Sequence, residues 1–341
     1  MSILVVKDLC TSFFTDAGEV KAVNGVSFTL EKGKVLGIVG ESGSGKSVTA
    51  YSIMQILSPK GKIISGSVKL HSQELIGADE NIIKDIRGNK ISFIFQDPMT
   101  SLNPTFTIGY QLTEAILLHT DRSKKEAYNR AVEMLELVNV NEPKKRMKQY
   151  PYELSGGMRQ RVMIAMALAC EPDILIADEP TTALDVTIQA QILELMKKLQ
   201  HDLGMSIIMI THDLGVVAQM CDEVLVMYAG SICERGTTSE IFYNPQHEYT
   251  KGLIRSIPSL SASESKLKPI PGTPIDLLNM PKGCAFSPRC DKAMKICLKE
   301  KPGEVIINGN HSSSCWMCIK NMHVSDEFSK ENKFKGGDYS E

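Results

Sequence analysis

One glycine-rich segment has the composition and spacing of a phosphate-binding loop. Residues 40–47 read GESGSGKS, which fits the pattern GxxxxGK[ST], and they lie between an apolar run and a helical pattern. The glycines let backbone N–H groups converge on phosphate oxygens at a helix N-terminus. We expect the lysine to contact the β- and γ-phosphates and the last serine to bind Mg²⁺. The residues expected to hold a nucleotide here are Gly40, Ser42, Gly43, Ser44, Gly45, Lys46 and Ser47.

Two acidic residues follow an apolar run and could act on the same phosphates. Residues 174–177 read ILIA, and Asp178 and Glu179 come directly after them. A carboxylate at the carboxyl end of a buried strand beside the loop can reach the Mg²⁺ shell. At a strand end the next residue can turn toward the γ-phosphate, so we expect Glu179 to orient a water molecule there.

A second glycine-containing turn could also bind an anion. Ser155, Gly156 and Gly157 precede a helical pattern, which places a hydroxyl and free N–H groups at a helix N-terminus. One loop already serves the phosphates, so a second needs a reason. The simplest is a dimer in which this turn of each chain covers the nucleotide of the other.

The hydrophobic pattern indicates which elements position these residues. The first 40 residues alternate apolar and polar positions, which predicts strands, and the run VLGIVG is apolar on both faces. From residue 174 onward strands alternate with helical runs, which predicts a parallel sheet with helices on both faces. We expect a domain over residues 1–235 with a helical subdomain at about 97–160. A C-terminal extension at 236–325 and a disordered polar tail at 326–341 would follow.

Composition excludes several classes of protein. The 341 residues carry a net charge of −2, so no basic field supports nucleic-acid binding. The sequence contains no apolar run of about 18 residues and no signal-peptide pattern at its start. We therefore expect a cytosolic protein whose role at a membrane would be peripheral.

Taken in order, the motifs resemble those of ABC-transporter ATPases over about residues 3–255. The resemblance implies a P-loop NTPase fold with a RecA-like parallel core, an N-terminal antiparallel β region and a helical subdomain. It further implies that Glu179 is the general base, that Gln96 contacts Mg²⁺ and the attacking water, and that His212 contacts the γ-phosphate. Asp185 would communicate across the dimer, and Phe13 would stack on adenine, with Phe14 as the neighbouring alternative. Met158 stands where many relatives have Gln.

The resemblance also implies partners and a place in the cell. Two such ATPases would close head-to-tail around two ATP·Mg²⁺, as a heterodimer with a sister subunit or as a homodimer in isolation. They would drive two transmembrane permease subunits from the cytoplasmic face of the membrane, with an extracellular peptide-binding protein acting indirectly.

Five of the nine cysteines crowd into the extension. In a reducing compartment such crowding points to a metal site more than to disulfides. Four thiolates suit either an iron–sulfur cluster or a tetrahedral zinc, and the wide spacings favour the cluster. The extension is similar to that of dipeptide and oligopeptide permease ATPases, in which four such cysteines are associated with a [4Fe–4S] cluster. The expected ligands are Cys284, Cys290, Cys297 and Cys315, with Cys318 as a substitute for the last.

Peptide import by an ATP-hydrolysing subunit is therefore the expected function. One alternative keeps the transporter but changes its cargo to nickel or an oligosaccharide. Another is a soluble ABC ATPase acting in DNA repair or translation. A single cassette without heptads or a basic patch argues against the second alternative.

Overall fold

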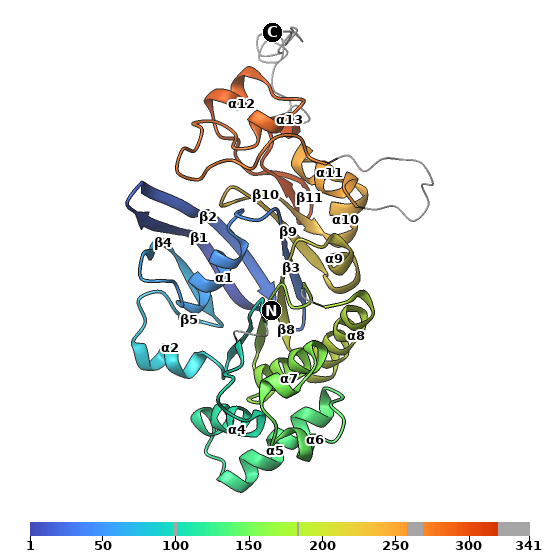
Figure 1. The fold of residues 1–341 in the computed structure, drawn as a ribbon. Helices are drawn as coiled ribbons and strands as arrows, with labels where there is room; N and C mark the ends of the chain where they lie inside the picture. The colour runs from blue at the N-terminus through green and yellow to red at the C-terminus, as the bar shows by residue number, and fades with distance from the viewer. Residues whose placement is uncertain (98–100, 183, 258–268, 320–341) are drawn as a thin grey trace.

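Two β-sheets organise the computed structural model, which describes residues 1–97, 101–182, 184–257 and 269–319 (Figure 1). The tail at 326–341, expected to be disordered, lies outside the described residues. The larger sheet has eight strands in the order β11-β12-β10-β9-β3-β8-β7-β6. Its five strands from β9 to β6 run parallel, which confirms the expected α/β organisation. These strands are β3 (Val35–Val39), β6 (Ile91–Ile94), β7 (Ile174–Asp178), β8 (Ser206–Thr211) and β9 (Glu223–Tyr228).

One face of the parallel strands is covered by helices. Alternate residues of a strand point to opposite faces, so in β7 Leu175 packs on the helical side while Ile176 packs on the other. The helical side holds α7 (Gly156–Leu168) and α8 (Val186–Leu203). The short helix α9 (Leu214–Met220) follows β8.

The other face is covered differently from the expectation of helices on both sides. There α1 (Lys46–Met54) shares a buried core with a second, antiparallel sheet in the order β2-β1-β4-β5. The alternating pattern of the N-terminal residues gives this sheet one apolar face, which must be buried against the central sheet. Its strands are β1 (Ser2–Thr15), β2 (Gly18–Glu31), β4 (Gly61–Leu70) and β5 (Gln73–Glu74), with α2 (Glu80–Ile86) following.

A helical region lies between β6 and the end of α7. It comprises α4 (Ile108–His119), α5 (Lys124–Leu137), α6 (Pro143–Arg146) and the 3₁₀ turn η1 (Pro151–Glu153). Ser123 and Glu126 form a capping box that begins α5, since each side chain accepts from the other residue's backbone N–H. In Figure 1 this region forms the end of the molecule opposite the extension.

The C-terminal extension is built into the central sheet. There β12 (His311–Ser313) pairs with β10 (Ser231–Thr237), and β11 (Val305–Asn308) completes the edge. The cassette surface supplies the apolar partners that the extension lacks alone, since Phe286 packs edge-to-face on Tyr228 at 5.3 Å between ring centroids. Its other elements are α10 (Thr238–Tyr243), α11 (Glu248–Arg255), η2 (Ser287–Arg289), α12 (Lys295–Lys299) and α13 (Trp316–Ile319).

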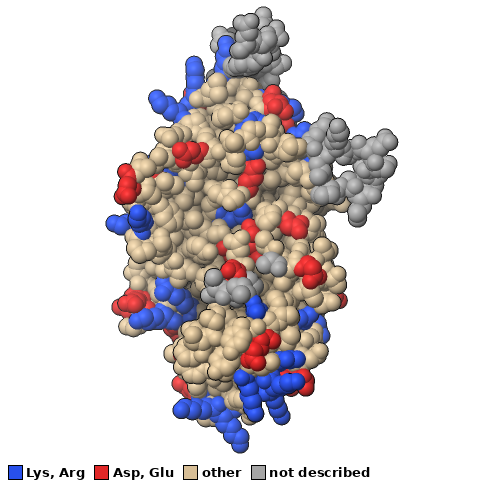
Figure 2. All heavy atoms as spheres, in the orientation of Figure 1, with Lys and Arg blue, Asp and Glu red and all other residues tan. Residues whose placement is uncertain are grey.

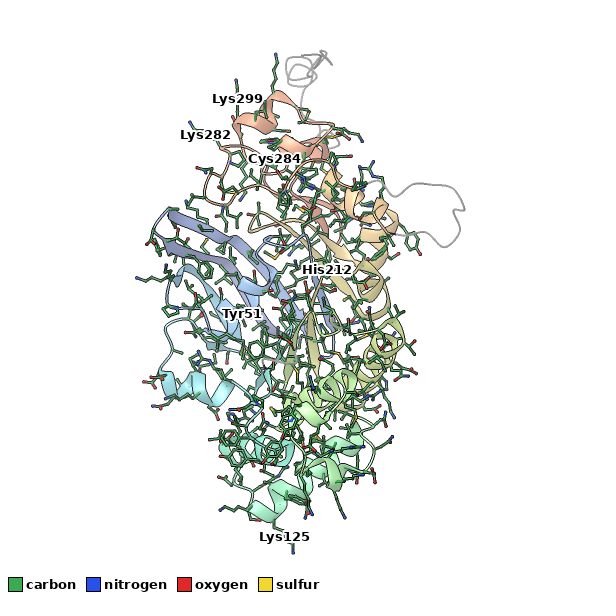
Figure 3. The ribbon with its side chains drawn as sticks, viewed as in Figure 1. Tyr51, Lys125, His212, Lys282, Cys284 and Lys299 are labelled. Atoms are coloured by element: carbon green, nitrogen blue, oxygen red, sulfur yellow. The ribbon has the colours of Figure 1, made fainter. Side chains whose placement is uncertain are left out.

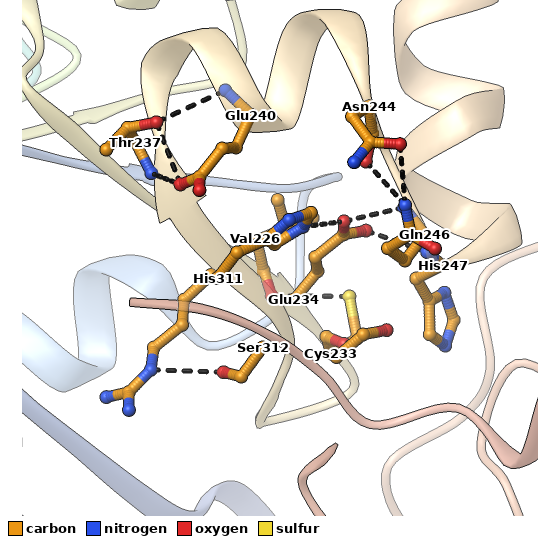
Figure 4. A network of polar contacts seen from close by, with 12 residues as sticks. Val226, Cys233, Glu234, Thr237, Glu240, Asn244, Gln246, His247, His311 and Ser312 are labelled. Carbon is orange, nitrogen blue, oxygen red and sulfur yellow. Dashed lines mark hydrogen bonds and ion pairs between the residues drawn. The ribbon is translucent and has the colours of Figure 1, made fainter. Parts of the chain in front are cut away.

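A buried polar network fastens the extension to the sheet edge (Figure 4). Glu234 of β10 accepts hydrogen bonds from the backbone N–H groups of Gln246 and His247 at 2.7 and 2.8 Å. Nε2 of His311 lies 2.8 Å from the same carboxylate, and both side chains are fully buried. One carboxylate thus satisfies three donors from two separate segments of the chain.

This network predicts a large effect of Glu234→Ala on stability. Three buried donors would lose their acceptor, at about 1–3 kcal/mol for each unsatisfied group. We expect urea denaturation to show a free energy of unfolding at least about 3 kcal/mol lower. Asp173→Ala is the control, because Asp173 pairs with His71 at an exposed position. Equal stability of the two variants would contradict the anchoring role of Glu234.

Candidate phosphate-binding site

The loop at residues 40–47 adopts a conformation that only glycine allows at two positions. Gly40 has φ +152°, and a Cβ atom there would lie 2.2 Å from the carbonyl oxygen of Met227. Gly45, with φ +99°, precedes α1, and its Cβ would lie 2.4 Å from the carbonyl oxygen of Ala22. The backbone therefore curls tightly from the end of β3 into the N-terminus of α1.

Lys46 places a buried positive charge inside this curl. Its Nζ donates to the carbonyl oxygens of Gly40 and Glu41 at 2.8 and 3.0 Å. Burial lowers the pKa of Lys46, while the nearby carboxylates of Glu179, Asp178 and Glu41 act in the opposite direction. Such an ammonium is suited to an anionic ligand.

Ser44 adds an unsatisfied donor to the same loop. Its side chain is buried, and its Oγ has no hydrogen-bond partner among the described residues. Buried hydroxyl groups are normally paired, so this atom is available to a ligand. Together with the helix N-terminus, it fits the chemistry of phosphate oxygens.

Ser47 and Asp178 supply oxygen ligands of the kind that Mg²⁺ prefers. Ser47 Oγ donates to Asp178 Oδ1 at 3.0 Å, and the Tyr51 hydroxyl donates to Oδ2 at 3.3 Å. Burial raises the pKa of Asp178, since its negative charge is poorly solvated. Burial and then this carboxylate raise the pKa of Tyr51 to about 12. A divalent cation beside Asp178 would compensate its buried charge.

Glu179 lies at the centre of a hydrogen-bonded group. Its Oε2 accepts from Gln96 Nε2 at 2.8 Å and from Thr182 Oγ1 at 3.0 Å, and its Oε1 accepts from His212 Nδ1 at 3.0 Å. Its φ of +48° is rare for a residue with a side chain and turns the chain sharply after β7. Burial alone would raise the pKa of Glu179, but the bonds from His212 and Thr182 lower it below the usual value. The structure thus brings together three residues that the sequence singled out.

Phe13 and Phe14 differ in their surroundings. The Phe13 ring lies against Gly61, and its cross-strand partner Val20 lines a cavity of about 270 Å³ together with the loop residues 42–44. Phe14 is 47% exposed, and Nζ of Lys62 lies 5.8 Å from its ring centroid. Of the two rings, Phe13 is the less exposed, and it is the one whose cross-strand partner lies at the cavity next to the loop.

The second glycine turn keeps its hydrogen bonds within its own helix. Ser155 caps α7 by accepting from the N–H of Met158 at 3.4 Å, and Gly157 lets α7 approach Ile188 of α8 closely. Ser155 and Gly156 are exposed, so they are open to a partner. Asp185, also exposed, caps α8 by accepting from Ile188 N at 2.9 Å.

Several residues of the site are not indicated by the sequence motifs. Thr182, which holds Glu179, follows it by three residues and could have been found by extending the acidic motif. Tyr51 lies one helical turn after Ser47 on α1, toward the middle of the molecule with His212 (Figure 3). Arg289 pairs with Glu41 of the loop from the distant extension, and nothing in the sequence indicates it.

The cysteines of the extension lie near one another but do not form a preformed metal site. Burial, with added effects of neighbouring thiols, raises the pKa of Cys284 and Cys290 to about 11. Within the described ranges, however, no three His, Cys, Asp or Glu side chains converge so as to hold a metal ion. The expectation of a zinc or [4Fe–4S] centre on Cys284, Cys290, Cys297 and Cys315 is therefore not supported by this geometry. Cys318, the fifth cysteine, is hydrogen-bonded to the Cys315 thiol, and this hydrogen bond lowers the pKa of Cys318 to about 7.

The charged side chains are unevenly distributed over the face seen in Figure 2. On the face in Figure 2, acidic and basic side chains are interspersed, and the basic ones gather at the end that carries the helical region. Exposed lysines there are Lys124, Lys125, Lys144, Lys145 and Lys148. In the part of the chain that the structure describes, no helix has the length and apolar character needed to cross a bilayer.

Two family models match the chain. The model of the ABC transporter matches residues 23–182, and that of the C-terminal region of oligopeptide/dipeptide transporters matches residues 233–297. The dipeptide transport ATP-binding protein DppD of Bacillus subtilis is 54% identical over 92% of this chain and 94% of its own length. The oligopeptide transport ATP-binding protein OppD of Escherichia coli is 52% identical over 90% of this chain and 91% of its own length.

Solved structures agree with these relatives. A dimeric post-hydrolysis state of an ATP-binding cassette, bound to ADP and phosphate, has a TM-score of 0.62 at 28% identity. It covers 69% of this chain and 98% of the cassette. A component of an ABC transporter complex from Clostridium perfringens has a TM-score of 0.60, and the match covers 71% of this chain and 91% of that component. The expected ABC cassette fold is thereby confirmed.

Lys46→Ala is expected to weaken ATP binding itself. The substitution removes a buried cation that would touch the phosphates before any reaction. Calorimetry with the full chain should show a dissociation constant for MgATP raised at least about tenfold, equivalent to about 1.4 kcal/mol. Lys197→Ala, on the exposed side of α8, should bind normally. Unchanged affinity of Lys46→Ala would show that this lysine does not contact phosphate.

Proposed function

This chain belongs to the ATP-binding proteins of ABC-type dipeptide and oligopeptide transporters, and we infer from this that it hydrolyses ATP to power the import of peptides. The observation that carries the inference is the group around Glu179. Its carboxylate accepts hydrogen bonds from Gln96, Thr182 and His212 at the end of β7. It also lies close enough to Lys46 for its charge to oppose the lowering of that lysine's pKa by burial. A carboxylate held in this way near the phosphate-binding loop supports a role of Glu179 as a base.

We propose that hydrolysis depends on the orientation of one water molecule by Glu179. A carboxylate with a lowered pKa is ionised at neutral pH and can accept a proton from water. Gln96 and His212 fix the direction of its two oxygens. His212 would also contact the γ-phosphate, while Lys46 offsets the charge that develops on the phosphate oxygens.

Mg²⁺ would be held by Ser47, with Asp178 and Gln96 in reach of its coordination shell. The close Ser47 and Asp178 oxygens and the raised pKa of Asp178 fit this assignment. The metal would supply positive charge against the β- and γ-phosphate oxygens. Phe13 would stack on the adenine ring, and the support for this is that its cross-strand partner Val20 lines the cavity next to the loop.

We propose that two such cassettes act as a dimer. The exposed turn of Ser155, Gly156 and Gly157 would cover the ATP of the partner, and Asp185 would contact the partner near the same interface. The solved cassette of similar fold is a dimer, which supports this arrangement. In the cell we propose a heterodimer with a sister ATPase.

We propose that the chain docks peripherally on two permease subunits at the cytoplasmic face of the membrane. Between β6 and the end of α4, several apolar side chains are exposed, which is typical of a protein interface. They are Phe95, Phe106, Tyr110 and Leu118. An extracellular peptide-binding protein would act only through the permease.

The other cargoes are less well supported. The relatives named above are described as proteins of dipeptide and oligopeptide transport, and the C-terminal region matches the model of those transporters. These findings do not favour nickel or an oligosaccharide. They also do not favour a soluble ABC ATPase of DNA repair or translation.

For the extension we propose a [4Fe–4S] cluster on Cys284, Cys290, Cys297 and Cys315, with zinc as the alternative. The support is the donor set, since four thiols of one region affect one another's pKa. Because these thiols do not converge on a single ion, the segment would have to adjust on binding. The cluster would supply a structural cross-link between loops of the extension.

Glu179→Gln is expected to keep ATP binding and to lose turnover. The amide cannot take a proton from water, and general-base effects amount to roughly 10²–10⁴ in rate. Phosphate release under saturating MgATP measures the loss, and calorimetry measures the retained binding. Glu194→Gln, on the outer side of α8, is the matched control. Near-normal hydrolysis by Glu179→Gln would exclude Glu179 as the base.

Cys290→Ser tests the metal centre in the extension. Protein purified without oxygen should be brown and contain about four irons per chain if a [4Fe–4S] cluster is bound. The variant should lose both and become protease-sensitive between about residues 275 and 320, while Cys170→Ser in the cassette should not. One zinc per colourless chain would favour the alternative, and anaerobic protein without metal would refute both.

A further inference from the structure

The phosphate-binding loop is held from the C-terminal extension. Arg289 of η2 donates from Nη1 and Nη2 to the two carboxylate oxygens of Glu41, at 2.5 and 2.9 Å. The backbone N–H of Glu41 donates to the hydroxyl of Tyr249 on α11 at 2.7 Å. Glu41 is the second residue of the loop, and its carbonyl oxygen accepts from Lys46. Both contacts from outside the loop come from residues beyond β10.

The guanidinium of Arg289 is rigidly placed. Its side chain is only 4% exposed, and Nε donates to the carbonyl oxygen of Pro271 at 2.8 Å. The guanidinium lies 5.9 Å from the ring centroids of Tyr228 and Phe286. Gly272, with φ +74°, leaves room for its aliphatic stem. A planar group held by a carbonyl and two rings cannot follow Glu41 if the loop moves.

The negative charge of Glu41 would repel an anionic ligand if it were not paired with Arg289. Its carboxylate bears a negative charge that acts on the pKa of Lys46, so it would compete with phosphate for the same ammonium. A bidentate guanidinium neutralises the carboxylate and fixes its two oxygens. The arrangement therefore leaves Lys46 free to meet the triphosphate.

We propose that Arg289 is a positioning residue for nucleotide binding: from the extension it neutralises Glu41 and fixes the loop in the shape that receives ATP. The proposal rests on the proposed function, since it concerns the affinity of the same site. It assigns to the extension an indirect part in ATP binding, because Arg289 would act through Glu41.

Arg289→Ala in the full chain tests the proposal. The unpaired carboxylate beside the phosphates should raise the dissociation constant and the KM for MgATP about 10- to 100-fold. The kcat at saturating ATP should change less than about threefold, because Glu179 and its partners are untouched. A variant that merely unfolds in part would instead lose kcat at unchanged KM.

The double variant Arg289→Ala/Glu41→Gln separates charge from folding. Removal of the carboxylate's charge should restore ATP affinity to within about threefold of the wild type. Arg235→Ala is the matched control, because Arg235 also joins the cassette to the extension, through Glu304 at 3.1 Å, but away from the loop. It should bind MgATP normally.

The outcomes are distinguishable. Wild-type chain that does not bind MgATP would refute the proposed function. Wild-type binding with unchanged affinity in Arg289→Ala would overturn the role of Arg289. That role would also be refuted if Arg289→Ala weakens binding but Glu41→Gln brings no rescue. If Arg289→Ala does not fold, Arg289→Gln in the full chain takes its place, since it also leaves the Glu41 carboxylate unpaired, and unchanged affinity there would equally overturn the proposal.

Discussion

The structure depends on one buried ammonium group among carboxylates. Lys46 lies inside a loop of backbone carbonyl and N–H groups, and Glu41, Asp178 and Glu179 all act on its charge. Each carboxylate is held by other partners, so that none of them closes onto the lysine. Asp178 is bonded by Ser47 and Glu179 by His212. The parallel strands matter because β3 and β7 end where these groups must meet.

Local features of the site could be predicted from the sequence. The glycines of residues 40–47 and the apolar run before Asp178 can be recognised from a few neighbouring residues. The structure places three of the residues named from such motifs, Gln96, Glu179 and His212, in one group. The ion pair of Arg289 and Glu41 could not be predicted in this way, because 248 residues separate the two. Spacing along a chain gives no information about contacts of that range.

The extension shows the same limit in its fold. The sequence predicted that crowded cysteines, and hence a metal centre, would organise it. A core exists there, but part of it belongs to the cassette, since Phe286 packs against Tyr228 as well as Tyr249. Periodicity also missed β11 and β12, which are short and gain their stability from pairing at the edge of a preformed sheet.

The origin of Arg289 has a consequence for how the protein is made. A ribosome that has just added Glu41 must add 248 further residues before the guanidinium exists. At about 5–20 residues per second this takes about 12–50 s. During that interval the nascent cassette carries an unpaired Glu41 and, for most of it, lacks Tyr249, so its ATP site is incomplete. On this proposal, only the full-length chain would bind ATP with full affinity. Fragments released early from the ribosome would compete poorly for ATP.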